Sequence, residues 1–81
     1  RMSAAINPFC VSLYGISYGK PVVVSHFGDQ HLAGRLMAMG ILPGSRIEVL
    51  RPAPFGGGLY VKADNLLIAL RKEEAEIILV R

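Results

Sequence analysis

The 81-residue sequence is poor in the residue types from which catalytic and metal centres are built. It has no tryptophan, one cysteine (Cys10) and two histidines, His26 and His31. One cysteine cannot form an internal disulfide bond, and with two histidines it does not supply the ligands of a usual zinc site. No histidine–acid pair is placed to activate Cys10 as a nucleophile. We therefore expect no catalytic residue, no metal site and no cofactor, and we expect that the protein is not an enzyme.

Long apolar runs and clusters of one charge are also missing. The apolar runs Val22–Val24 and Leu66–Leu70 are much shorter than the roughly 20 residues of a transmembrane helix. No signal peptide is recognisable, because Asn7 and Pro8 interrupt the apolar residues near the start. The net charge is +3, and acidic residues are interleaved with the basic ones, so charge argues only weakly for nucleic acid as a partner. These absences favour a cytoplasmic protein without membrane insertion.

Apolar residues make up 52% of the chain and occur in short segments between turns. A chain of this length and composition forms one globular domain, which we place at residues 12–81, after an extension of residues 1–11. β-branched, aromatic or alternating apolar residues predict about five short strands, at 20–27, 46–51, 59–63, 66–70 and 76–80. We predict a mainly β fold, a small SH3-like antiparallel barrel with one short helix inserted after the first strand and a helical turn at 71–75 before the last strand. Closure of the barrel would leave no exposed strand edge.

The inserted helix has a recognisable start. Asp29 is a favourable N-cap residue, and Leu32, Leu36 and Met39 follow at helical spacing. Gly34 inside the helix costs about 1 kcal/mol relative to alanine. The helix is therefore expected to depend on packing against the rest of the domain.

The helix is followed by two local signals for a corner that leads into a strand. Gly40 suits the left-handed position just past a helix end, and this arrangement places Ile41 over Leu36. Pro43-Gly44 fits the two central positions of a type II turn. The whole stretch 35–50 is therefore interpreted as a structural corner without catalytic residues.

Three blocks of the sequence, RLMAMGILPG (35–44), RPAPFG (51–56) and IALRKEEAEIILV (68–80), carry a family resemblance. In this order they resemble the RLxxLGxxPG, RxxPxG and xALRxxEAxxIxV signatures of the FeoA family, small cytoplasmic proteins of bacterial ferrous iron uptake. The resemblance covers residues 20–81. Met39 replaces a usual leucine, a swap of similar volume. Residues 56–58 are three glycines where the family usually has Gly-Asp-Pro, so this loop lacks an acid and a proline.

The resemblance implies an SH3-like fold and a non-enzymatic accessory role beside FeoB, a membrane transporter with a cytoplasmic GTP-binding domain. It does not imply that this chain itself binds iron or nucleotide, and the glycines at 56–58 are not followed by the Lys-Ser/Thr of a phosphate-binding loop. The family blocks mark as structural positions Leu36, Met39, Gly40, Pro43, Gly44, Ala69 and Leu70.

Six side chains are candidates for contact with a partner: Arg35, Met37, Arg51, Phe55, Tyr60 and Arg71. An aromatic side chain at a loop tip, such as Phe55, can anchor an interface, but it can also fold back over the end of the barrel. Alternatively, Arg35 is simply solvated. Met37 is alternatively part of the core. The segment 71–74 is interpreted as a capped, charged turn, whose exposed ion pairs each contribute well under about 1 kcal/mol.

Several other functions remain open at this stage. Small barrels often bind RNA, but Arg51, Phe55, Tyr60 and Lys62 would form only a weak version of a basic and aromatic face, so we do not expect nucleic acid as the main partner. The same family pattern occurs as the C-terminal regulatory domain of DtxR-type metal-dependent repressors; no winged-helix segment precedes it in this sequence, and we expect a stand-alone protein. A reader of proline-rich peptides needs an aromatic-lined groove and is the least expected. Self-association through Phe55 and the apolar strands near the sheet edge is also open.

Overall fold

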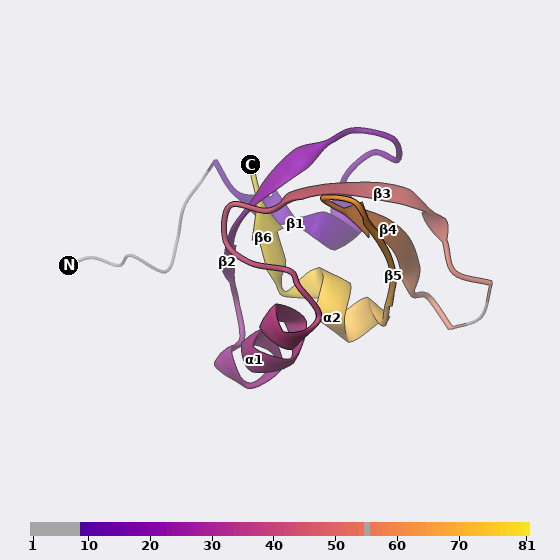
Figure 1. Ribbon diagram of the computed structural model, residues 1–81. Helices are drawn as coiled ribbons and strands as arrows, with labels where there is room; N and C mark the ends of the chain where they lie inside the picture. The colour runs from indigo at the N-terminus through magenta and orange to yellow at the C-terminus, as the bar shows by residue number, and fades with distance from the viewer. Residues whose placement is uncertain (1–8, 55) are drawn as a thin grey trace.

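The structure is a computed structural model that describes residues 9–54 and 56–81 (Figure 1). Within these residues the chain forms, in order, β1 (Val11–Ser12), the 3₁₀ helix η1 (Leu13–Gly15), β2 (Val22–Phe27), α1 (Gln30–Ala38), β3 (Arg46–Pro52), β4 (Leu59–Ala63), β5 (Leu66–Leu70), α2 (Lys72–Glu76) and β6 (Ile78–Val80). The helix and the strands expected from the sequence are confirmed. The short strand β1 was not predicted, and residues 1–8 of the predicted extension lie outside the described residues.

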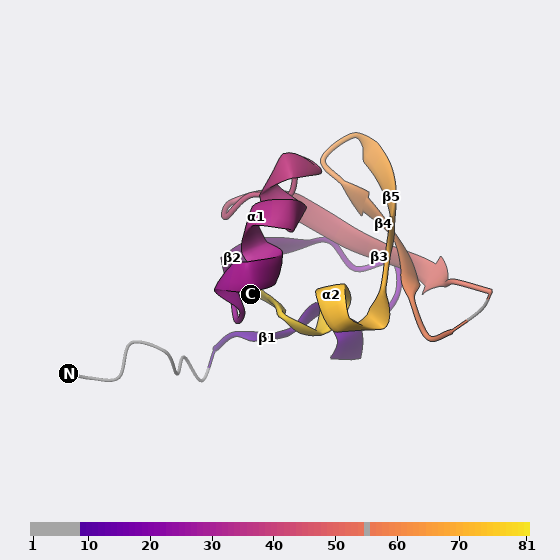
Figure 2. The same ribbon diagram turned by 90° about the horizontal axis from the view of Figure 1, so that it is seen from below.

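All described strands belong to one antiparallel sheet with the order β1-β6-β2-β3-β4-β5. β3, β4 and β5 are neighbours in sequence and in space, whereas β6 lies between β1 and β2. The sheet curls around its core, and both helices lie at the same end of it (Figure 1). The view from below shows α1 and α2 next to each other there (Figure 2). This is the predicted SH3-like fold, with the helix α1 inserted after β2 and the helix α2 before β6.

The curled sheet keeps two edges, β1 and β5, because no hydrogen-bonded pairing joins these strands in the described part of the chain. The expectation that closure leaves no strand edge is therefore wrong. The chain leaves β5 at Leu70 and forms α2, and β6 then pairs with β2 and β1 instead of with β5. One side of the β5 backbone consequently has no neighbouring strand.

The core lies inside the curl and is filled from the strands and both helices. On β3, Ile47 and Val49 are almost completely buried between exposed or half-buried neighbours, which confirms the predicted alternation. Leu36 is the fully buried residue of α1. The complete core cluster consists of Leu13, Val24, Leu36, Ile41, Ile47, Val49, Leu59, Val61, Ala63, Leu70, Ala75, Ile78 and Val80.

Helix α1 begins and ends where the sequence predicts. The Asp29 Oδ1 atom accepts a hydrogen bond from the His31 N–H at 2.7 Å, which caps the first turn. At the other end Gly40 has a φ of 98°, and its N–H donates to the Met37 carbonyl at 3.0 Å. The Ile41 N–H donates to the Leu36 carbonyl, also at 3.0 Å. These two bonds form a Schellman motif, and Leu36 and Ile41 both belong to the core cluster, as expected for the apolar pair of this motif.

The turn after α1 joins the helix to the sheet. Gly44 has a φ of 94°, and the Ser45 N–H donates to the Leu42 carbonyl at 2.9 Å, as in the predicted type II turn with Pro43 at its second position. The Gly44 N–H also donates to the carbonyl of Val24 in β2, at 2.8 Å. The turn is thus fixed against the strand that precedes the helix, and it directs the chain into β3.

Candidate partner-binding surface

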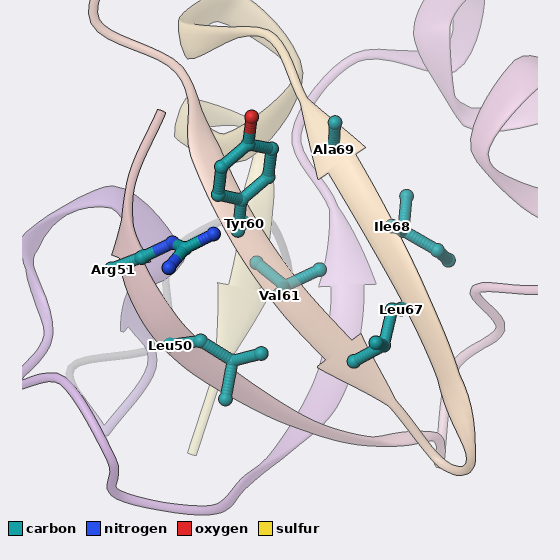
Figure 3. Close-up of a pocket in the computed structure, with 7 residues that line it drawn as sticks. All are labelled: Leu50, Arg51, Tyr60, Val61, Leu67, Ile68 and Ala69. Atoms are coloured by element: carbon teal, nitrogen blue, oxygen red, sulfur yellow. The ribbon is translucent and has the colours of Figure 1, made fainter. Parts of the chain in front are cut away.

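A shallow groove lies on the outer face of β3, β4 and β5 (Figure 3). Its volume is about 610 Å³. Leu50 and Arg51 reach from β3 toward β4, and Leu67 reaches from β5 toward β4, which carries Tyr60 (Figure 3). We call this feature the β3–β5 groove, and it is lined by Leu50, Arg51, Tyr60, Val61, Leu67, Ile68 and Ala69.

A β-bulge in β3 places two adjacent side chains on the outer face. Val49 lies opposite Val61, and Arg51 lies opposite Tyr60, so Leu50 is an extra residue without a partner in β4. Strict alternation would turn either Leu50 or Arg51 inward. The bulge leaves both exposed, and it therefore gives the groove an apolar wall and a cationic rim on the same strand.

Arg51 and Tyr60, two of the predicted contact residues, are in contact across the strands. The Arg51 Cζ atom lies 5.0 Å from the centroid of the Tyr60 ring, within the range of a cation–π interaction. This contact holds the guanidinium at the surface and leaves its N–H groups available. The only ion pair in the described part of the chain lies elsewhere, so no carboxylate neutralises Arg51.

The apolar side of the groove is unusually exposed for leucine. Leu67 is 75% exposed and Leu66, its neighbour at the start of β5, is 56% exposed. These residues were not among the predicted contact residues. The signal was present, because a run of five apolar residues without alternation places apolar side chains on both faces of a strand.

Arg35 has a structural partner on α2. Its Nε atom lies 3.3 Å from the Glu74 Oε2 atom, and the Glu74 side chain is almost fully buried. The other carboxylate oxygen accepts a hydrogen bond of 2.8 Å from the Arg71 N–H at the start of α2. The capped turn interpreted at residues 71–74 is therefore confirmed, but the expectation that its ion pairs are exposed is wrong for Glu74. The capping role follows from a Glu three residues after the N-cap position, half of a capping box, whereas the burial depends on α1.

The remaining candidates do not converge on the groove. Met37 is 43% exposed on α1, and Arg71 is exposed at the N-cap of α2. Met39, in contrast, packs against the core. Phe55, the candidate at the loop tip, lies outside the described residues. The structure therefore brings together Arg51 and Tyr60, and places Arg35 and Met37 on the helix α1.

Metal-ligating side chains do not gather in groups of three or more in residues 9–54 and 56–81. The imidazole Nδ1 atom of His26 is hydrogen-bonded to the Ser25 hydroxyl at 2.9 Å. Cys10 is half-buried and carries a free thiol. No helix among the described residues has the length and apolar character needed to cross a membrane.

The curled sheet, the inserted helix and the groove define the chain as a small SH3-like domain. The sequence model of the FeoA domain family matches residues 11–81. The chain therefore belongs to the FeoA family, which is associated with ferrous iron transport. This confirms the resemblance carried by the three sequence blocks.

Solved structures of two FeoA proteins have the same fold. The FeoA protein from Chlorobium tepidum is 30% identical with a TM-score of 0.76, and the match covers 88% of this chain and 69% of that one. FeoA from Stenotrophomonas maltophilia, solved with zinc, is 28% identical with a TM-score of 0.73, and the match covers 88% and 89%. The latter is described as an SH3 domain protein and as a candidate activating factor for ferrous iron transport.

The fold also occurs within a longer regulator. A manganese-dependent transcriptional repressor is 25% identical with a TM-score of 0.82. The match covers 93% of this chain but only 42% of the repressor. The same SH3-like unit is thus used both in small FeoA proteins and as a part of a larger protein.

Proposed function

We propose that this protein is a non-enzymatic, cytoplasmic accessory protein of ferrous iron uptake that acts by binding the FeoB transporter. Membership of the FeoA family supports a role in ferrous iron transport. The β3–β5 groove supports the proposal that the protein acts by binding another protein. The observation that carries the proposal is the combination of exposed Leu50 and Leu67 with the unneutralised Arg51 around one hollow surface. An exposed apolar patch of this kind marks an interaction site, and aromatic and arginine side chains are the residues that dominate binding energy in interfaces.

The rigid sheet that carries the groove residues agrees with a role in binding. The outer face of β3, β4 and β5 is supported from below by a filled core, so the groove residues are presented on a rigid sheet. Side chains that are held in place before binding lose little conformational entropy when a partner arrives. Arg51 is an example, because its contact with Tyr60 already orients it.

A second candidate is a regulatory domain of the kind found in metal-dependent repressors. It is supported by the likeness to the manganese-dependent repressor. In that case the groove would bind another domain of a regulator instead of a transporter. The two candidates predict different partners for the same surface.

The proposal is tested by titrating the isotope-labelled protein with the cytoplasmic region of the cognate FeoB transporter and recording amide shifts. We expect shifts on β3, β4 and β5 that weaken in Tyr60→Ala, because this variant removes the ring that orients Arg51. Tyr18→Ala is the matched control, since Tyr18 is an exposed tyrosine that does not line the groove. A complete lack of shifts, with and without guanine nucleotide, would contradict the proposal.

A further inference from the structure

β5 is an edge strand without the features that usually protect such an edge. Natural edge strands carry charged residues, proline or bulges that prevent pairing with another chain. All five residues of Leu66–Leu70 are apolar, and the register with β4 is regular throughout. An edge of this kind is able to accept a further strand.

The register shows which backbone groups of β5 point to the open side. The two-residue connection Asp64-Asn65 places Ala63 opposite Leu66, and the pair that flanks such a connection is hydrogen-bonded. Bonded and non-bonded pairs alternate along an antiparallel ladder. Leu67 and Ala69 therefore turn their N–H and C=O groups away from β4 and toward the open edge.

The outer face beside this edge combines a small residue with a cation. Ala69 lies opposite Tyr60, and its methyl group leaves the β3–β5 groove open toward the edge. Arg51 on β3 lies against the Tyr60 ring on β4, and its guanidinium lies on the β3 side of this ring (Figure 3). Across the outer face the order from the open edge is therefore Ala69, Tyr60 and Arg51, so an acidic side chain on a strand next to β5 lies on the same face as this cation.

We propose that the open edge of β5 binds an extended segment of a partner protein, which adds to the sheet as a further strand. The segment carries a large apolar side chain beside Leu67 and an acidic side chain beside Ala69, on the face of the sheet that carries Arg51. These two positions are two residues apart, so they lie on the same face of an extended strand. The inference rests on the proposed function, in which the partner is the transporter, and it adds the chemistry of the bound segment.

Charge favours an acidic segment over a second copy of the chain. The protein carries a net charge of +3, and Arg51 has no carboxylate partner in the described part of the chain. In a pair of copies joined through β5, each copy would offer only the uncharged Leu66–Leu70 to the other. The charged groups would then remain unmatched, whereas an acidic residue of a partner is attracted by the positive charge of Arg51 on the same face.

The experiment measures amide hydrogen exchange in the full chain by NMR, alone and with the cytoplasmic region of the transporter. Strand addition slows exchange at Leu67 and Ala69 by about tenfold or more, because their N–H groups become hydrogen-bonded. The amides of β1 at the opposite edge serve as an internal control and keep their rates.

Two substitutions test the side-chain and backbone parts separately. Arg51→Glu reverses the charge at the groove and is expected to weaken binding by about tenfold or more. Arg46→Glu is the matched control, because Arg46 is an exposed arginine of the same strand outside the groove, and its effect is expected to stay below about twofold. Ala69→Pro removes an outward N–H at a position where an edge strand tolerates proline. Arg51→Glu tests the inference independently of whether Ala69→Pro folds.

Each outcome is decisive for the inference. Slow exchange at both amides, together with a selective effect of Arg51→Glu, supports it. Binding to the transporter without protection of these amides overturns strand addition and leaves the proposed function intact, whereas a lack of binding overturns both. Protection in the free protein that rises with its concentration assigns the edge to a second copy. Binding of a uridine oligonucleotide of about 20 residues, with an affinity that falls steeply as the salt concentration rises, would show that Arg51 and Tyr60 bind RNA. Either result overturns the inference.

Discussion

Glu74 shows how a single carboxylate connects two helices. Its side chain is 4% exposed, and each oxygen has a partner, the Arg71 N–H on one side and Arg35 on the other. A buried carboxylate without such partners would be strongly unfavourable. Because Arg35 itself is 57% exposed, the charge–charge part of the contact is weakened by solvent. The hydrogen bond at the start of α2 is therefore expected to carry more of the stabilisation than the ion pair.

This difference can be measured with two variants of Glu74. Glu74→Ala removes the acceptor for the Arg71 N–H and is expected to lower the free energy of unfolding by about 2–3 kcal/mol. Glu74→Gln keeps an acceptor and loses only the charge, so a smaller loss of about 1 kcal/mol is expected. Urea denaturation of both variants gives the two values. Equal losses would show that the ion pair with Arg35 dominates.

At the scale of the element, α1 depends on glycine at one position and is weakened by it at another. Gly40 has a φ of 98°, a conformation that other residues enter only with strain. Gly34 lies inside the helix, and nothing lies within 4 Å of the position that a Cβ atom would take there. The two residues therefore have opposite roles in the stability of the same helix.

The substitution of each glycine by alanine separates these roles. Gly40→Ala is expected to lower the free energy of unfolding by about 1–2 kcal/mol, since its Cβ meets Leu66 only at an ordinary 3.5 Å and the cost is conformational. Gly34→Ala is expected to raise it by about 0.5–1 kcal/mol. Thermal unfolding followed by circular dichroism measures both. A stabilising Gly40→Ala would contradict the role of Gly40 in the Schellman motif.

For the molecule as a whole, leucine residues of similar size fall into two groups. Leu36 is fully buried in the core, and Leu67 is 75% exposed at the edge of the sheet. A domain of this size has a net stability of only about 5–10 kcal/mol, so the loss of one core side chain removes a large share of it. The exposed leucine contributes little to folding, which fits a role in binding.

The contrast between Leu36 and Leu67 predicts different results for the same substitution. Leu36→Ala is expected to lower the free energy of unfolding by about 2–5 kcal/mol through lost burial and a cavity. Leu67→Ala is expected to change it by less than about 0.5 kcal/mol, while binding to the transporter region is weakened. Guanidinium denaturation and a binding titration test the pair. A large loss of stability in Leu67→Ala would show that this side chain supports the sheet.

The sequence predicted those parts of the fold that depend on local chemistry. Asp29, Gly40 and Pro43-Gly44 act on backbone groups a few residues away, so their roles follow from residue type and spacing. The alternation of β3 likewise follows from a buried and an exposed face. The open edge of β5 was not predicted, because it depends on which distant strand pairs with β6.

The candidate surface was predicted only in part, for a related reason. Arg51 and Tyr60 were selected as side chains suited to interfaces, and their contact follows from the register of β3 and β4. That register contains a bulge at Leu50, which no local sequence pattern predicts. The burial of Glu74 also depends on a contact between two helices that are far apart in sequence.

Because Leu50 is an extra residue in β3, its presence affects which partner the groove recognises without affecting the fold. Because Val49 and Arg51 already face consecutive residues of β4, deletion of Leu50 leaves a regular ladder with the same inward residues. We expect such a shortened chain to fold with nearly unchanged stability, since Leu50 is an exposed residue of the outer face. It would lack the apolar wall of the groove on β3. Relatives that differ by one residue at this point would then share a fold while differing in the partner segments that they select.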